Sequence, residues 1–212
     1  MLPFGARPTY KLSSSSPASL TADHVSPRDF LNVHDYDGEG REVVVEGTVA
    51  KVSIYNSKNL ILHIGRVVSS TVEVFNSSNL TLVVGPRSPP SSDEEVSPLG
   101  VLQLDPTLSD VSIRYTHPKA IGSVVIAPLT STNPAGQPTF GFSSLSLQAG
   151  NAEPFLLFAK DGSLQDPGLA GSTISPSSPL PDLARQLVLS YREAGWTLSG
   201  LARGEKDYPQ LA

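Results

Sequence analysis

Hydrophobic and polar residues alternate along the centre of the chain, and the alternation repeats. Residues 50–65 read AKVSIYNSKNLILHIG and residues 70–85 read STVEVFNSSNLTLVVG, an offset of 20 residues with no gap. The repeat conserves apolar positions, two asparagines and a glycine: Val52 matches Val72, Ile54 Val74, Asn56 Asn76, Asn59 Asn79, Leu60 Leu80, Leu62 Leu82 and Gly65 Gly85. Alternation predicts half-buried β-strands. The intervening Asn-Ser-Lys-Asn predicts a turn, because asparagine tolerates a left-handed backbone.

Two short strands per repeat cannot enclose a hydrophobic core, so successive repeats are expected to stack. Stacking places Val52 over Val72 and Leu62 over Leu82, and it buries one continuous aliphatic column. We therefore expect an all-β protein, a right-handed parallel β-helix (a solenoid) with coils of about 20 residues spaced about 4.8 Å apart. The turn asparagines should form an amide ladder along one corner.

Weaker alternating runs extend the array in both directions. They predict strands at 42–46, 101–104, 111–115, 123–126, 142–147 and 155–160. Proline-containing segments at 86–98 and 128–139 predict loops, since proline cannot occupy the centre of a ladder. The solenoid is then expected to span 27–160.

The flanking segments have other patterns. Residues 1–26 are rich in serine and proline, which predicts an extended segment. Ser26 and Pro27 predict the start of a short helix. Within 161–212, a linker precedes Leu183, Leu187, Tyr191 and Ala194, whose helical spacing predicts a C-terminal α-helix packed on the solenoid.

The composition excludes several classes of protein. Hydrophobic residues make up 39% and charged residues 17%, a balance too apolar for a disordered chain. The net charge of −5 argues against a nucleic-acid partner, and the absence of cysteine excludes thiolate metal sites. No apolar run reaches the roughly 18 residues of a membrane span, and no secretory signal pattern is present. We expect a cytoplasmic protein without a cofactor, metal or membrane partner.

The stretch from 43 to about 128 resembles the C-terminal β-helix domain of adenylyl cyclase-associated proteins, within the tubulin-binding cofactor C-like superfamily. The resembling residues are VSIYNSKNLILHIGRVVSSTVEVFNSSNLTLVVG and VLQLDPTLSDVSIRYTHPKAIGSVVIAP. With an inserted loop at 86–98, the family pattern aligns 101–105 with 71–75 and 111–115 with 80–84. The resemblance implies a protein-binding module whose partner is actin-like or related to small GTPases or tubulin. Arg66 is the nearest match to an arginine with which the cofactor C branch stimulates GTP hydrolysis.

Two groups of residues are candidates for function. In the aligned register, Tyr55, Phe75 and Asp105 form one outward file, and His63, Val83 and Arg114 form another. With Arg66, the residues Tyr55, Phe75, His63 and Arg114 make a candidate binding surface; a covering segment of the chain is the structural alternative. Arg114, Tyr115 and His117 combine a cation, a phenol and an imidazole and are the candidate catalytic cluster, with ordinary surface polar groups as the alternative.

These candidates leave two functions open. The first is a cyclase-associated-protein-like module that binds a cytoskeletal or regulatory protein. The second is a small-molecule enzyme or ligand binder, with a pocket between a sheet and the C-terminal segment near Tyr191 and Trp196. Whether the chain is an enzyme and whether it forms a homodimer are both left open by the sequence.

Overall fold

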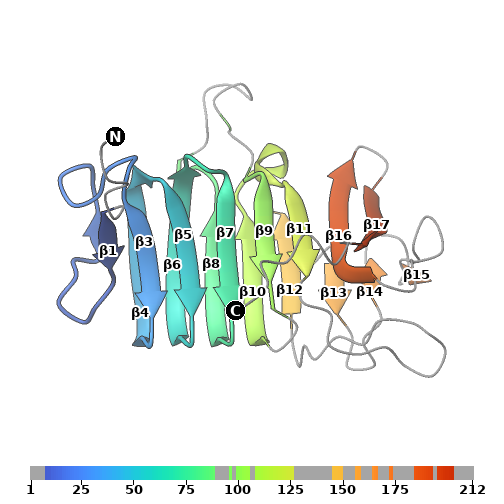
Figure 1. The fold of residues 1–212 in the computed structure, drawn as a ribbon, viewed down its shortest axis with the longest axis horizontal. Helices are drawn as coiled ribbons and strands as arrows, with labels where there is room; N and C mark the ends of the chain where they lie inside the picture. The colour runs from blue at the N-terminus through green and yellow to red at the C-terminus, as the bar shows by residue number, and fades with distance from the viewer. Residues whose placement is uncertain are drawn as a thin grey trace, which may run out of the picture.

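Two mostly parallel β-sheets make up the fold of the protein, which is all-β (Figure 1). The computed structural model describes residues 8–88, 96, 99–105, 108–126, 145–149, 156–158, 164–166, 172–173, 184–192 and 195–202. Sheet A contains, in spatial order, β1 (Thr9–Lys11), β3 (Phe30–His34), β5 (Lys51–Tyr55), β7 (Thr71–Phe75), β9 (Val101–Leu104), β11 (Ser123–Ile126), β16 (Ala184–Arg192) and β17 (Gly195–Ala202). Sheet B contains β15 (Ser172–Thr173), β14 (Leu164–Asp166), β13 (Leu156–Phe158), β12 (Leu145–Ala149), β10 (Ser109–Tyr115), β8 (Ser78–Val84), β6 (Lys58–Val67), β4 (Asp37–Val49) and β2 (Ser19–Leu20).

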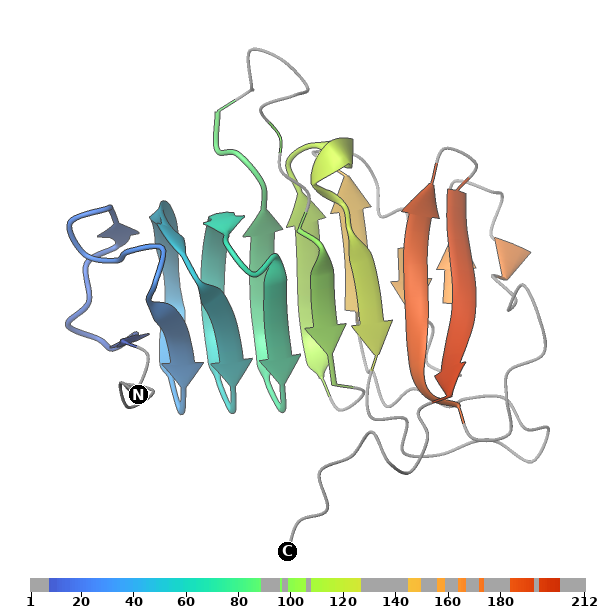
Figure 2. The same ribbon diagram turned by 45° about the horizontal axis from the view of Figure 1, so that its top comes forward.

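Successive strands alternate between the two sheets, from β1 in sheet A to β12 in sheet B. The strands of one sheet therefore run opposite to those of the other, as Figure 2 shows for β3 to β10. Within each sheet the predicted register is confirmed: Val52 pairs with Val72, and Leu62 pairs with Leu82, in parallel. Sequence-adjacent strands such as β5 and β6 do not form a hairpin.

The register across the inserted loop is also confirmed. Thr71 pairs with Val101, and Leu80 pairs with Val111, as the family pattern implied. Of the two loop predictions, 128–139 lies outside the described residues, and so does 86–98 except for residues 86–88 and 96. The observed pairing still requires extra chain between β8 and β9, because Val101 stacks on a residue 30 positions earlier rather than 20.

One hydrophobic core lies between the sheets. Inward side chains from both sheets belong to a single cluster of buried residues, among them Val52, Leu62, Val72, Leu82 and Ile113. Residues next to them in sequence face outward, so each strand alternates between buried and partly exposed positions. Because the inner faces share one core, the outer faces of the two sheets point to opposite sides of the molecule.

Left-handed backbone at one corner turns the chain from sheet A into sheet B. The asparagines of the repeat all have positive φ: 51° at Asn56, 55° at Asn59, 43° at Asn76 and 49° at Asn79. Asp35, before β4, has a φ of 52°. Asparagine and aspartate adopt this conformation more readily than other non-glycine residues, which explains why the repeat keeps Asn at these positions.

The predicted amide ladder is present at this corner. Asn76 Nδ2 donates to Asn56 Oδ1 at 3.2 Å, and Asn79 Nδ2 donates to Asn59 Oδ1 at 2.7 Å. The second column continues to Asp37, whose Oδ1 accepts from Asn59 Nδ2 at 2.8 Å. This hydrogen bond, with smaller contributions from the backbone N–H of Glu39 and from Lys58, lowers the pKa of the Asp37 carboxyl.

Both helix predictions are wrong. The segment after Pro27 forms β3, and no α-helix occurs in the part of the chain that the structure describes. The C-terminal segment forms β16 and β17, an antiparallel pair in which β16 adds to β11, so that Ser123 pairs with Ser190. The run Leu-Val-Leu-Ser-Tyr is so short that its apolar positions fit both the period of a helix and the period of a strand. The open edge of β11 decides for a strand, because its backbone groups need hydrogen-bond partners.

The N-terminal segment packs on the first strands of the stack. Leu12, Leu20 and Val25 are buried in the common core. The guanidinium of Arg41, on β4, donates to the backbone carbonyls of Ser13, Ser14 and Ser16. The serine-rich stretch is thus hydrogen-bonded to β4 rather than detached from the fold.

Candidate functional site

An aromatic row crosses the outer face of sheet A where its strands end. His34, Tyr55 and Phe75 occupy equivalent positions on β3, β5 and β7. The rings of His34 and Tyr55 stack with centroids 5.1 Å apart and planes 9° from parallel, and Tyr55 is 44% exposed. Because stacked rings cover each other's faces, the row presents ring edges to solvent. Such a row stiffens the sheet and offers a narrow contact strip.

The five residues of the candidate binding surface do not form one patch. His63 and Arg114 lie on β6 and β10 of sheet B and pair through Val83 of β8, on the side of the molecule opposite Tyr55 and Phe75. His63 Nε2 lies 3.0 Å from Glu42 Oε1. The predicted surface is therefore divided, with His63 and Arg114 on one face of the molecule and the aromatic row on the other.

The candidate catalytic cluster is also separated. Arg114 is exposed, whereas Tyr115 points inward and is 0% exposed. Burial raises the pKa of the Tyr115 phenol, so this group keeps its proton and cannot act as a base near neutral pH. His117 Nδ1 accepts the backbone N–H of Lys119 at 3.1 Å, where it caps the 3-10 helix η2 (Pro118–Ala120). The residues have structural positions rather than a shared acid–base geometry.

Replacing Tyr115 by phenylalanine should keep or increase stability. The Tyr115 hydroxyl is buried and has no hydrogen-bond partner among the described residues, and such a group costs about 1–3 kcal/mol of desolvation. Tyr115→Phe removes the hydroxyl and leaves the ring, so we expect the free energy of unfolding in urea to rise by about 1 kcal/mol. A fall of similar size would mean that the hydroxyl has a stabilising partner.

The alternative site was a pocket between a sheet and a C-terminal helix, and the structure has strands where that helix was predicted. Tyr191 and Trp196 face each other across β16 and β17, with ring centroids 5.2 Å apart. They belong to a strand pair that extends sheet A.

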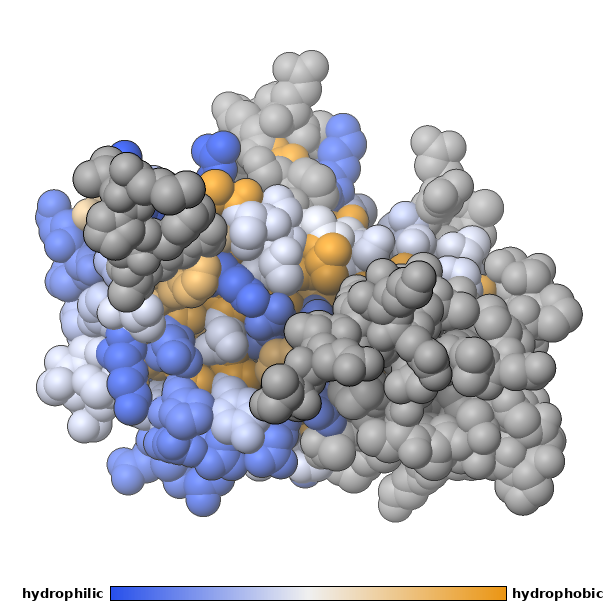
Figure 3. Space-filling model, viewed as in Figure 1, coloured by the Kyte–Doolittle hydropathy of each residue, from blue (hydrophilic) through white to orange (hydrophobic). Residues whose placement is uncertain are grey.

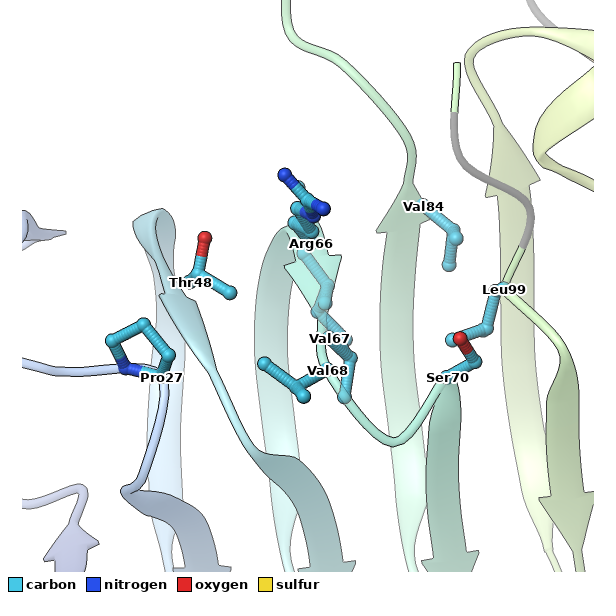
Figure 4. Close-up of a pocket in the computed structure, with 10 residues that line it drawn as sticks. Pro27, Thr48, Arg66, Val67, Val68, Ser70, Val84 and Leu99 are labelled. Carbon is cyan, nitrogen blue, oxygen red and sulfur yellow. The ribbon is translucent and has the colours of Figure 1, made fainter. Parts of the chain in front are cut away.

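A cleft of about 370 Å³ lies at the other corner, where strands of sheet B end and strands of sheet A begin (Figure 4). We call it the corner cleft; it is lined by Pro27, Thr48, Ile64, Gly65, Arg66, Val67, Val68, Ser70, Val84 and Leu99. Thr48 and Arg66 are neighbours in the parallel pairing of β4 and β6. Figure 4 shows the Thr48 hydroxyl and the Arg66 guanidinium pointing the same way.

The corner cleft combines an apolar wall with a cation that has no partner among the described residues. Val68 is 58% exposed, although Val67 beside it is buried. Arg66 is exposed and makes no ion pair or side-chain hydrogen bond with any described residue. By contrast, Arg87 lies 3.7 Å from Glu46, and Arg41 binds the serine-rich stretch.

Sequence reasoning found Arg66 but missed its surroundings. Pro27, Val68 and Leu99 come from three different connections and Thr48 from the end of β4, and only the stacking of the strands brings these four residues together. The one local signal was the Arg-Val-Val run at the end of β6, in which two apolar residues are adjacent instead of alternating. In a half-buried strand, such a pair leaves one apolar side chain exposed.

The remaining described residues show no further chemistry of a recognised kind. They contain no group of three or more His, Asp or Glu side chains placed to hold a metal ion. They also contain no helix with the length and hydropathy to cross a bilayer. Comparisons of the chain with protein-family models, with curated proteins and with solved structures give no match.

Proposed function

We propose that the stacked strands form a right-handed β-helix like the C-terminal domain of adenylyl cyclase-associated and tubulin-binding cofactor C-like proteins. The parallel register at a spacing of 20 residues supports this fold. The continuation of that register across the insertion supports it as well. The right hand follows from the general preference of parallel crossover connections.

On this fold we place a cytoplasmic protein-binding module. The observation that carries the proposal is the corner cleft, which is lined by exposed Val68 and by Arg66, a cation without an ion pair among the described residues. Exposed apolar area beside an arginine is typical of the anchor points of protein interfaces. An actin monomer is the partner that the resemblance suggests first, followed by tubulin and small GTPases.

The outer face of sheet A would carry the rest of the contact. The cleft lies where β5, β7 and β9 begin, and the aromatic row lies where β5 and β7 end, about 13 Å away at 3.3 Å per residue. Between them, Lys51 Nζ and Glu73 Oε1 form an ion pair of 2.6 Å. Figure 3 shows hydrophilic and hydrophobic side chains interleaved over the strands at its left, without one large apolar patch. Such a surface suits a partner that binds reversibly.

Charge reversal at two arginines tests this function. Purified protein is immobilised and titrated with monomeric actin, tubulin and GTP-loaded small GTPases, and the dissociation constant is measured by biolayer interferometry. We expect Arg66→Glu to weaken capture by at least about tenfold, which is ~1.4 kcal/mol. Arg114→Glu is the matched control, because it reverses an exposed arginine of β10 that lies in the same sheet as Arg66, makes no ion pair with a described residue and does not line the corner cleft. We expect it to change capture less than about twofold.

Tyr55→Ala/Phe75→Ala measures the contribution of the aromatic row in the same titration. If this double variant loses less affinity than Arg66→Glu, the main contact with the partner lies at the corner cleft. If the wild-type protein captures none of these partners, the proposed function is wrong. Equal loss in Arg66→Glu and Arg114→Glu would show nonspecific charge attraction and would also overturn it.

A further inference from the structure

Arg66 carries positive charge that the described part of the protein does not neutralise. Lys51, Lys58 and Arg87 each lie within 4 Å of a carboxylate, that of Glu73, Asp37 or Glu46. Arg66 takes part in no such pair, in a chain whose net charge is −5. A guanidinium presents a planar fork of N–H donors that matches the two oxygens of a carboxylate. The free fork of Arg66 is therefore suited to a carboxylate from outside.

The surface beside this cation is apolar and rigidly supported. Val68 forms an exposed wall, and the buried side chains of Val67, Val84 and Leu99 lie at the base of the cleft. The turn that carries Val68 is fixed by backbone hydrogen bonds: Val68 N–H donates to Val49 at 2.8 Å, and Ser70 N–H donates to Val67 at 3.0 Å. An aliphatic side chain can lie on Val68 without reorganising the turn, which limits the entropy lost on binding.

These two halves require a ligand that is acidic and aliphatic at once. We infer that the corner cleft takes a partner segment in which a glutamate or aspartate is flanked by an aliphatic residue. The carboxylate binds the Arg66 guanidinium, with the Thr48 hydroxyl beside it, and the aliphatic side chain covers Val68. This inference rests on the proposed protein-binding function and specifies the chemistry of the partner at that site.

An anion without an apolar group would bind Arg66 but would make no contact with the apolar wall of the cleft. Phosphate or a nucleic-acid backbone would use Arg66 but would leave Val68 exposed to water. Binding along a nucleic-acid strand also needs several cations in line, whereas Arg66 is the sole charged residue among the described residues that line the cleft. The apolar wall thus favours a peptide over a phosphate-bearing ligand.

The test uses the full-length protein and short peptides as probes. Chemical shifts of the Val68 methyl groups and of the Arg66 Nε–H are followed by NMR during titration with acetyl-Leu-Glu-Leu-amide. We expect saturable shifts at both groups, and affinity at least about fivefold lower for acetyl-Leu-Gln-Leu-amide, since a charge-assisted hydrogen bond is about twice as strong as a neutral one. Raising the ionic strength should lower the affinity for the glutamate peptide and leave the affinity for the glutamine peptide unchanged.

Three variants separate the two halves of the cleft. Arg66→Gln should abolish the preference for the glutamate peptide over the glutamine peptide. Val68→Ser should lower the affinity for both peptides by the same factor. Arg114→Gln should alter neither affinity. All three side chains are exposed, so the fold is expected to persist, and unchanged amide spectra away from the cleft verify it.

Several results would overturn the inference. These are equal affinity for the glutamate and glutamine peptides, shifts that persist in Arg66→Gln, and displacement of the peptide by inorganic phosphate at equal concentration. Failure here is distinguishable from failure of the proposed function. Capture of actin without any peptide shift at Val68 would refute only the acidic–aliphatic chemistry, whereas peptide binding without capture of any tested protein would overturn the proposed function and leave the acidic–aliphatic chemistry of the cleft in place.

Discussion

Leu82→Ala is expected to lower the free energy of unfolding by about 3 kcal/mol, within the range of about 2–5 kcal/mol typical of buried leucine. Leu82 is 0% exposed, and it stacks between Leu62 below and Ile113 above in the parallel register of sheet B. Its removal leaves a cavity that both neighbours line, and the backbone cannot close it because the hydrogen bonds of β8 fix the spacing of the strands. Urea unfolding followed by far-UV circular dichroism measures the change.

Thr81→Ala serves as the matched control for this variant. Thr81 precedes Leu82 on β8 and faces the outside of sheet B, where it is half-buried. We expect a loss below about 1 kcal/mol, as for most partly exposed substitutions. If the two variants lose equal stability, the core does not lie between the sheets as described, and the inward assignment of Leu82 is incorrect.

Gly85→Ala should destabilise the protein by about 2 kcal/mol or more, whereas Gly65→Ala should be nearly neutral. The two glycines occupy the same position in two successive copies of the repeat, but Gly85 has a φ of 118°, a conformation that costs other residues about 1–3 kcal/mol. An added Cβ would lie 2.4 Å from Oγ1 of Thr116. At Gly65 the nearest atom to an added Cβ is the Val45 carbonyl oxygen at 3.5 Å, an ordinary contact.

The difference between the midpoints of urea unfolding of these two variants is the quantity to measure. The pair shares residue type, substitution and place in the repeat, so the comparison isolates backbone conformation and space. Equal midpoints would contradict the left-handed backbone at Gly85. The repeat alone treats both glycines alike; the positive φ of Gly85 and the side chain of Thr116 beside it are what separate them.

Much of the central fold could be predicted because its causes are local or periodic. Alternating apolar residues specify which side chains of β5 to β8 face inward, and a one-residue slip would place every one of them in water. The offset between Asn56 and Asn76 fixes the register of the stack, since each amide bonds its equivalent 20 residues away. The same reasoning places β10 on β8 once the inserted loop is allowed for.

Other features depend on contacts that no local pattern encodes. The segment at 184–192 has a run that fits a helix or a strand, and the open edge of β11 makes it a strand. Tyr115 was grouped with Arg114 by proximity in sequence, yet neighbours in a strand face opposite sides of a sheet. Residues adjacent in sequence thus lie on opposite faces of one sheet, with Tyr115 in the core and Arg114 outside.

The amino-acid sequence by itself determined the strands, the turns and the column of aliphatic side chains in the central repeats. These follow from the period of two in a strand and from the tolerance of asparagine for left-handed backbone. Only the tertiary structure decided which surfaces are continuous. It placed His63 and Arg114 on the face of the molecule opposite the aromatic row. It also assembled the corner cleft from Pro27, Thr48, Val68 and Leu99. The physical reason is that a turn's surroundings come from the chain stacked above and below it, and these neighbours lie 20 or more residues away.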